Sequence, residues 1–454
     1  MSWRRFRDYD PDQDLLLPPS LLDWLPDGHL ALFVSDVIDG LDLSEMLASY
    51  DSPEGKGAPP YHPQMLLKVL VYGYATGTFS SRKLAAKCVD DVGFRYLSAQ
   101  QTPDFRTFIK FRSRHLEFFR GVFVQVVEFA RESGLVKMGH LSIDGTKVKG
   151  NASKHKAMSY GHMLKYERKL RREIDELLKH AEAIDEAEDK EYGDGDGYSL
   201  PEQLRDRRKR LQVIGEARKR IEERAKRRAE AEQERREKEA EARREEGKKP
   251  KRYRKPPSTK PKAKEQENFT DPESRLMRDG ATKGYIQGYN AQVGVEGSHR
   301  IIVAVEVGNN AADVGSLLPV LDASVENTGE CPDEVSADSG YKSEENFAGL
   351  EDRGVDGYIA CGREVYDRRI GCPRGRIPKD ATLTDRMARK LLTKHGRGVY
   401  GKRKHISEPP IGWIKSVLGF RQFSLRGLEK VAAEWNLVCL ALNIRRMGQM
   451  GSPS

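Results

Sequence analysis

Hydrophobic residues recur at helical spacing over the first 135 residues of the chain. A period of three to four residues indicates helices that bury one face. Ser80 or Ser81 fits the start of one helix, because a serine side chain can accept a hydrogen bond from the first turn. The pattern predicts helices over 63–74, from 80 or 81 to about 89, from 105 onward, and over 121–132.

The helix that begins at Phe105 combines an apolar face with four basic residues, Arg106, Lys110, Arg112 and Arg114. Short helices with a basic face are typical of a helix-turn-helix DNA-binding unit. An ordinary small helical bundle explains this segment equally well.

A different pattern fills residues 155–265, which are mostly charged. Alternating steps of three and four residues predict two coiled-coil seams. The first contains Met163, Tyr166, Leu170, Ile174, Leu177, Ala181 and Ile184, and the second contains Leu204, Leu211, Ile214, Ile221 and Ala225. With a flexible loop at 193–197 between them, the seams predict an antiparallel helical hairpin. Tyr198 stands where a calcium loop would need Asp or Asn, so that reading of the loop is weak.

Beyond the second seam, residues 228–265 are strongly basic. We expect a solvated helix that passes into a disordered basic linker. Such a segment is either an arm that binds phosphates or a merely solvated connection.

Strand-like runs occupy the remainder, at 139–148, 289–295, 301–307, 334–338 and 355–360. The second and third are joined by Glu296-Gly-Ser-His299, which predicts a β-hairpin. Helices are expected at 313–327, 343–352, 409–418 and 427–447, and residues 362–400 look irregular. This order predicts an α/β unit, a mixed sheet with helices on its faces.

The net charge of the chain indicates the kind of molecule that it binds. The 454 residues include 79 Lys and Arg against 70 Asp and Glu, a formal charge of +9. An excess of positive charge favours an anionic partner, most often nucleic acid, although it also fits a highly charged surface without one. Five cysteines without a C-x-x-C pair argue against a disulfide framework or a zinc site.

The hydropathy pattern also bears on the cellular compartment of the protein. No apolar run approaches the about 18 residues of a membrane span, and the charged N-terminus leads to no signal-like stretch. We expect a cytoplasmic protein with no membrane partner.

Three acids are the candidate catalytic residues. Asp144 lies in the strand-like run 141–148, Asp338 ends the run 334–338, and Glu408 is expected to open a helix. Carboxylates that converge from two strand ends and a helix can hold two divalent metals, which activate water and stabilise the leaving oxygen of a phosphodiester.

Each acid also has a plain structural interpretation. Asp144-Gly145 is a strong turn signal, and Asp338-Ser-Gly340 also fits a turn. Glu408 before two prolines fits a carboxylate that does no more than stabilise the start of a helix. The neighbouring cations favour the functional interpretation. Lys415 lies seven residues after Glu408 on nearly the same helix face, and Tyr400 and Arg403 precede it where they could grip DNA phosphates.

These residues make the chain resemble a bacterial insertion-sequence transposase of the DDE type, similar to the IS1182 family and related to the IS4 and IS5 groups. The resemblance runs from Tyr61-His-Pro63 to the motif that ends at Met447. Its other motifs are Ile143–Ser153, Tyr192-Gly193, Leu200–Leu204, Asp271–Met277, Gln287–Val293, Ala337–Tyr341 and Glu408–Lys415. No single motif is specific to this family, but the combination of motifs is.

The resemblance implies an RNase H-like catalytic core, two Mg²⁺ ions for which Mn²⁺ may substitute, and DNA cleavage followed by strand transfer. Asp144, Asp338 and Glu408 are the implied catalytic and metal-binding triad. The family's Tyr-Arg-Glu-Lys signature matches Tyr400, Arg403, Glu408 and Lys415. Four residues separate Arg403 from Glu408 where the common signature has three, so Lys404, which has that spacing, is a second candidate.

The expected organisation has three parts. A helical DNA-binding domain covers 1–135, the catalytic core covers 136–154 and 266–447, and the charged hairpin with its basic linker covers 155–265. Some relatives carry a β-rich insertion before the Glu, whereas here the large insertion follows Asp144. The expected partner is double-stranded DNA, both transposon ends and target, with a homodimer on the paired ends. The alternatives are an inactive DNA-binding protein and an RNase H-like nuclease without strand transfer.

Overall fold

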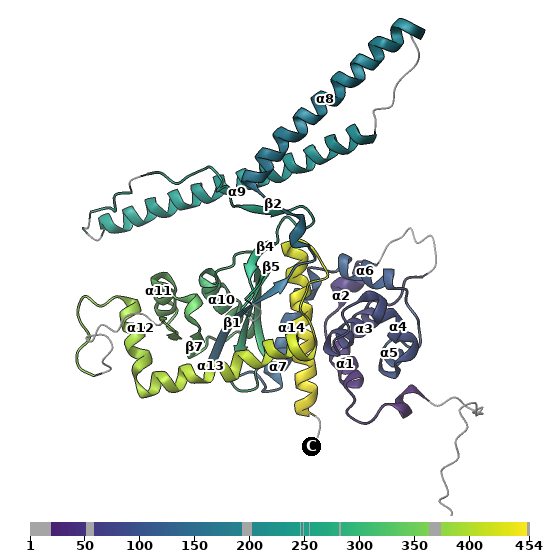
Figure 1. Cartoon of the computed structure of the whole chain (residues 1–454). Helices are drawn as coiled ribbons and strands as arrows, with labels where there is room; N and C mark the ends of the chain where they lie inside the picture. Colours follow the sequence, from purple (N-terminus) through teal and green to yellow (C-terminus); the bar gives the residue numbers. More distant parts are fainter. Residues whose placement is uncertain are drawn as a thin grey trace, which may run out of the picture.

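The computed structural model describes residues 20–451 except 51–58, 193–201, 246, 248, 254, 281–282 and 363–373. For residues 154, 180–192 and 202–204 it describes the backbone alone. A mixed sheet forms the centre of the molecule, and helix α14 (Leu428–Gly451) stands between this sheet and a group of N-terminal helices (Figure 1). A long helical hairpin projects from one end (Figure 1).

The central sheet joins antiparallel and parallel strands around β1. Its order is β4-β5-β1-β7-β8, with β6 paired to the same strand β5. β5 is antiparallel to β1, β4 and β6, whereas β7 is parallel to β1 and β8 is parallel to β7. The strands are β1 (His140–Lys149), β4 (Arg275–Arg278), β5 (Tyr285–Glu296), β6 (Ile302–Gly308), β7 (Glu334–Ala337) and β8 (Asp356–Ile359). The predicted strands and the predicted hairpin at 289–307 are confirmed.

Helices cover both faces of the sheet. Helix α10 packs against β6, β5 and β1, and α13 packs against β1, β5, β7 and β8. Helix α11 follows β7 and packs beside α10 and α12. These helices are α10 (Leu317–Thr328), α11 (Glu344–Asp352), α12 (Leu383–Leu392) and α13 (Lys394–Gly412).

Two predictions in this region are wrong. Residues 383–400 are helical rather than irregular, because Thr382 and Thr393 each cap a helix with their side chains. Glu408 therefore lies inside α13 and does not open a helix, and Pro409 and Pro410 lie in the last turn of α13. The π-helical turn Trp413–Val417 follows, so the predicted helix at 409–418 is not a separate α-helix.

The N-terminal helices share their core with the sheet. One hydrophobic core runs from α1 through the sheet to α14, which packs against α1, α3, α7 and β6. The helices are α1 (Leu30–Asp39), α2 (Ser44–Ala48), α3 (Pro63–Ala75), α4 (Ser81–Asp90), α5 (Val92–Leu97), α6 (Phe105–Arg114) and α7 (Phe118–Glu132). Short 3-10 turns lie at Leu21–Trp24, Lys154–Lys156, Val314–Ser316 and Ser339–Tyr341. All four helices predicted in this part are confirmed.

The expected basic face of α6 is only partly free. Arg106 and Lys110 are exposed, but Arg112 is buried and donates hydrogen bonds to the hydroxyls of Tyr74, Ser81 and Ser424. Arg112 therefore does not belong to an exposed basic face, because its guanidinium joins α6 to α3, α4 and the segment before α14.

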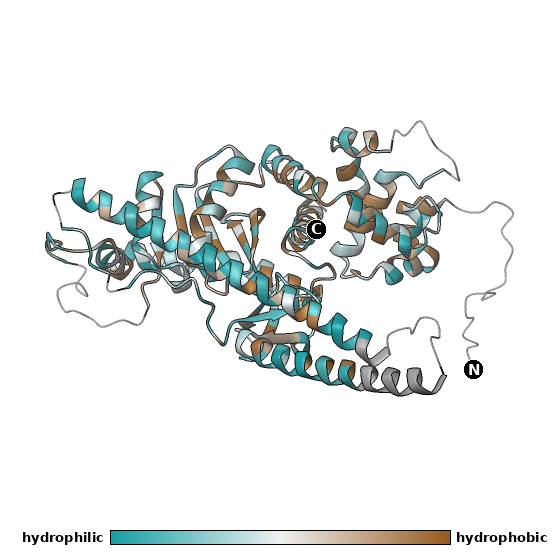
Figure 2. Ribbon diagram, turned by 90° about the horizontal axis from the view of Figure 1, so that it is seen from above, coloured by the Kyte–Doolittle hydropathy of each residue, from teal (hydrophilic) through white to brown (hydrophobic). Residues whose placement is uncertain are grey.

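The hairpin consists of α8 (Tyr160–Tyr192) and α9 (Glu202–Glu245), and a small sheet of β2 (Ala157–Ser159) and β3 (Gln266–Asn268) lies at its base. It has its own small core, in which Met163 and Leu170 of α8 pack with Ile214 and Ile221 of α9. Figure 2 shows that the ribbon of the hairpin is mainly hydrophilic, whereas the hydrophobic segments gather in the sheet and the helices around it. The antiparallel hairpin is confirmed. The loop at 193–197 lies outside the described residues, as do the side chains of Ala181, Ile184 and Leu204.

The segment after the second seam is more ordered than predicted. Helix α9 continues to Glu245, supported by ion pairs such as Arg236–Glu232, and the chain then folds back along it. Tyr253 donates a 2.8 Å hydrogen bond to Glu239 and lies under the Arg236 guanidinium. The expected disordered linker is wrong for the described part of 228–265, because these contacts hold it against α9.

Candidate active site

Asp144 and Asp338 occupy equivalent positions on neighbouring parallel strands. The register of β1 and β7 pairs Ser142 with Ser336, and both acids come two residues later. Neighbouring strands lie about 4.8 Å apart, so this register brings the two carboxyl groups to one edge of the sheet. Asp144 is inside β1, which continues to Lys149, and the turn interpretation of Asp144-Gly145 is therefore wrong. Asp338 directly follows β7 and accepts a 2.7 Å hydrogen bond from the Gly340 amide.

Helix α13 meets Asp144 from one face of the sheet. The Ser407 hydroxyl donates to Asp144 Oδ2 at 3.2 Å, and an Arg403 terminal nitrogen lies 3.4 Å from the same oxygen. The other terminal nitrogen of Arg403 lies 3.9 Å from Glu408 Oε1. Arg403 thus connects two of the three predicted acids.

The three acids are neighbours without forming one ligand set. Asp144 and Asp338 come together through strand register, and Glu408, whose side chain is 55% exposed, is reached through Arg403. Within the described part of the chain, no group of three His, Cys, Asp or Glu side chains is close enough to hold a metal ion.

Burial dominates the electrostatics of Asp144. It raises the pKa of this carboxyl above its usual value, and the negative charge of Asp338 raises it further. The Arg403 guanidinium acts in the opposite direction and lowers the pKa of Asp144. Two neighbouring carboxyl groups that repel each other are an arrangement that a cation can stabilise.

The donor set fits a divalent cation by its chemistry. Carboxylate oxygens are the ligands that Mg²⁺ prefers, and the Asp144–Asp338 pair supplies them from two neighbouring strands, one within β1 and one directly after β7.

Of the predicted phosphate-binding residues, Arg403 lies closest to the acids. Its guanidinium is 5.8 Å from the Tyr400 ring, and Tyr400 is half-buried on the same helix. Lys404 is exposed on α13, and no hydrogen bond or ion pair of its side chain is found among the described residues. The geometry therefore favours Arg403 over Lys404 as the cation next to the acids.

Lys415 differs from its prediction in two ways. It lies in the π-helical turn Trp413–Val417, so regular α-helical spacing does not relate it to Glu408. Its side chain is half-buried, and Nζ donates a 2.8 Å hydrogen bond to the Lys147 carbonyl instead of being free beside Glu408. Burial lowers the pKa of Lys415. This lysine fastens the turn after α13 to β1.

The sequence analysis missed a buried polar network on the opposite face of the sheet. Asp313 accepts hydrogen bonds from Lys147, Asn290 and Gln292 at 2.7–2.9 Å. The Tyr341 hydroxyl donates to Gln292, and burial raises the pKa of Tyr341 well above its usual value. The only sequence signal is that four of these residues, all except Asp313, fall within the family motifs quoted above.

Gly145 has a packing role beside this network. A Cβ at this position would lie 2.5 Å from the Gln292 amide nitrogen, so any larger residue would require the Gln292 amide to shift out of its hydrogen bonds. Close packing across β1 and β5, and not a turn, explains the glycine after Asp144.

None of the helices in the described part of the chain is long and apolar enough to cross a membrane. A comparison with curated proteins finds no match, and a comparison with solved structures finds none either.

Two protein families match the chain. Residues 19–114 match the family described as Transposase domain (DUF772), and residues 257–444 match the Transposase DDE domain. The DDE domain implies an RNase H-like fold, and the mixed sheet with flanking helices is consistent with it. Enzymes with this domain act on DNA and generally use divalent metal ions. The two matches together indicate an insertion-sequence transposase of the IS1182 type.

Proposed function

We propose that this transposase binds the terminal inverted repeats of its insertion sequence, cleaves the DNA ends by metal-dependent hydrolysis, and joins them to target DNA. The observation that supports this most directly is the pairing of Asp144 and Asp338 on adjacent parallel strands, with Arg403 and Glu408 beside them.

In this proposal Asp144, Asp338 and Glu408 would hold two Mg²⁺ ions, or Mn²⁺ in their place. Bound divalent ions supply Lewis-acid stabilisation of the scissile phosphate and activation of a nucleophilic water or hydroxyl. Strand register positions Asp144 and Asp338, and Ser407 orients Asp144 through its hydroxyl. Arg403 balances the charge of Asp144 in the free protein and lies where it can also bind a DNA phosphate.

DNA contacts outside the site are proposed for the N-terminal helices, where Arg106 and Lys110 are exposed on α6. Two copies of the chain on paired ends form the proposed active assembly. The division into a DNA-binding domain at 1–135, a catalytic core at 136–154 and 266–447, and an inserted hairpin at 155–265 belongs to the same proposal.

The deciding experiment is Asp144→Asn in a cleavage assay with Mg²⁺ on DNA that carries the ends flanking the gene. Asparagine keeps the shape and loses the charge that holds a cation, so cleavage should fall by at least about 100-fold. Binding of the ends should persist, because it rests on many phosphate contacts. Asp36→Asn on the exposed face of α1 is the matched control.

The outcomes separate the alternatives. Cleavage at the wild-type rate by Asp144→Asn would refute the assignment of this acid. Wild-type protein that binds the ends without cutting them indicates a DNA-binding protein, and cleavage without joining to target DNA indicates a nuclease.

A further inference from the structure

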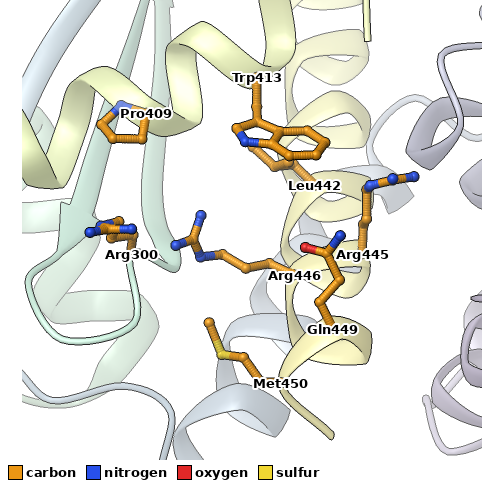
Figure 3. A pocket seen from close by; sticks show the side chains of 8 residues that line it. All are labelled: Arg300, Pro409, Trp413, Leu442, Arg445, Arg446, Gln449 and Met450. Atoms are coloured by element: carbon orange, nitrogen blue, oxygen red, sulfur yellow. The ribbon is translucent and has the colours of Figure 1, made fainter. Parts of the chain in front are cut away.

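A basic pocket of about 220 Å³ lies between the end of α13, α14 and the turn that joins β5 to β6 (Figure 3). Its lining includes Pro409 of α13, Trp413 of the π-helical turn, Arg445 and Arg446 of α14, and Arg300 from the turn between β5 and β6. Pro409 is the residue after Glu408, so one wall of the pocket adjoins the third predicted acid.

Two arginines face each other across this pocket. In Figure 3 the Arg446 side chain extends from α14 toward Arg300. Its Nε donates a 2.6 Å hydrogen bond to the His299 carbonyl, and no hydrogen bond of its terminal nitrogens is found among the described residues. Burial lowers the pKa of Arg446, and the positive charge of Arg300 contributes to the same shift. The two guanidinium groups therefore repel each other.

The turn that presents Arg300 is built around a buried carboxylate. Glu296 accepts hydrogen bonds from the backbone amides of Ser298, His299 and Ile301. This turn holds Arg300 at a φ of +60°, a left-handed conformation that is unfavourable for a residue with a side chain. Three amides already engage the Glu296 carboxylate, so it is not a free partner for the arginines.

Trp413 and Arg445 form the adjoining wall. The Arg445 guanidinium lies 5.3 Å from the Trp413 ring and donates a 2.9 Å hydrogen bond to the Ala75 carbonyl. Its Nε is buried without a partner. No ion pair to Arg300, Arg445 or Arg446 occurs in the part of the chain that the structure describes. The pocket thus concentrates positive charge that an anion would balance.

We propose that this pocket binds a phosphate of the DNA strand that passes Glu408, with Arg300 and Arg446 as its ligands and the Trp413 ring against the adjacent sugar or base. Guanidinium groups bind phosphate through paired hydrogen bonds, and an indole offers the flat apolar surface that nucleotides cover. The inference rests on the proposed function, since it assigns a strand-holding site next to the same acids.

The test measures DNA binding without divalent metal, so that it is independent of cleavage. Arg300→Asn suits the left-handed backbone, and Arg446→Gln keeps a donor for the His299 carbonyl. Each substitution should weaken binding of a flanking-end duplex by roughly ten-fold. Each should also reduce the slope of log binding constant against log salt concentration by about one, because one phosphate contact is lost. Arg386→Gln, which removes an exposed arginine on α12, should change neither.

Unchanged affinity and salt slope in both pocket variants, with normal binding by the wild type, would overturn the inference and leave the proposed function intact. If Arg446→Gln does not fold, the exposed Arg300→Asn decides alone. A wild type that neither binds nor cleaves the ends refutes the proposed function itself.

A second arm separates a DNA phosphate from free phosphate. Inorganic phosphate is titrated into the wild type and the double variant while the melting temperature is followed. If phosphate stabilises only the wild type while both variants bind DNA normally, the pocket is a free-phosphate site and the DNA assignment is wrong.

Discussion

Arg403 lies between Asp144 and Glu408 and contacts both carboxylates. It contacts Asp144 at 3.4 Å and Glu408 at 3.9 Å with different terminal nitrogens. A lysine has one compact ammonium group and cannot reach two carboxylates in this planar way. The position of Arg403 between the acids matters as much as its charge.

Arg403→Lys should therefore lower the single-turnover cleavage rate by roughly 10- to 100-fold, because the charge stays and the planar fork is lost. Lys404→Ala, a change at the exposed neighbour, should stay within about two-fold of the wild type. The rates are compared on the same DNA ends after circular dichroism confirms folding. A reversed order of effects would make Lys404 the cation of the signature.

Lys415 connects the turn after α13 to the central strand. Its 2.8 Å hydrogen bond to the Lys147 carbonyl is half-buried, so Lys415→Ala should cost about 1–2 kcal/mol of stability. Because the unfolding entropy is about 2.1 cal/mol/K per residue, a chain of this size loses only about 1 °C of melting temperature per kcal/mol. Lys404→Ala is the control that should leave the melting temperature unchanged. An unchanged melting temperature in Lys415→Ala, together with slower cleavage, would instead make this lysine a phosphate ligand.

At the scale of elements, α13 and its π-helical turn organise the site. Pro409 and Pro410 lack amide hydrogens, so the carbonyl groups one turn earlier lose their usual helical partners. The prolines fall in the last turn of α13, and the wider π-helical turn Trp413–Val417 follows. One face of this stretch brings Arg403 and Ser407 to Asp144, and its end supplies Pro409 and Trp413 to the basic pocket.

The charged hairpin is an element with its own core, so it should be removable. The Tyr160 and Gly161 amides bond to the Glu265 and Ala263 carbonyls, and a short Gly-Ser link from Gly161 to Ala263 would therefore close the gap. We expect the shortened chain to unfold cooperatively near the wild-type melting temperature and to retain Mg²⁺ binding.

This deletion needs one accompanying change. Arg220 and Arg224 of α9 pair with the fully buried Glu267, and their loss would leave a buried charge unpaired. Glu267→Gln removes that charge, and the same substitution in the full-length chain is the control. Loss of cooperative unfolding in the shortened protein would show that the hairpin is part of the main core.

At the scale of the whole molecule, one hydrophobic core runs from α1 through the sheet to α14. Binding of a cation at the three acids should therefore change the free energy of unfolding of the whole chain. If a divalent cation binds only the folded chain, Mg²⁺ at ten times its Kd adds about 1.4 kcal/mol to the free energy of unfolding. We expect Mg²⁺ to raise the melting temperature of the wild type and to have little effect on Asp144→Asn or Asp338→Asn. NaCl at equal ionic strength is the control. Equal shifts in all three proteins would mean that Mg²⁺ binds elsewhere.

The sequence by itself determined which elements form wherever hydrophobic spacing is regular. The strands around Asp144 and Asp338, the hairpin at 289–307 and the paired helices α8 and α9 follow from periodicities that short-range geometry imposes. The combination of family motifs also identified Asp144, Asp338 and Glu408 as candidates, and these three acids are neighbours in the fold. No single motif was sufficient to identify them.

Only the tertiary structure decided how side chains far apart in the chain meet. The burial of Arg112, the contact of Lys415 with β1, the Asp313 network and the basic pocket all depend on packing between distant elements, which local patterns do not encode. The prolines after Glu408 suggested a helix start, but the threonine caps at 382 and 393 and the packing of α13 on the sheet outweighed that local signal. The physical reason is that secondary structure depends on neighbours along the chain, whereas a site depends on neighbours in space.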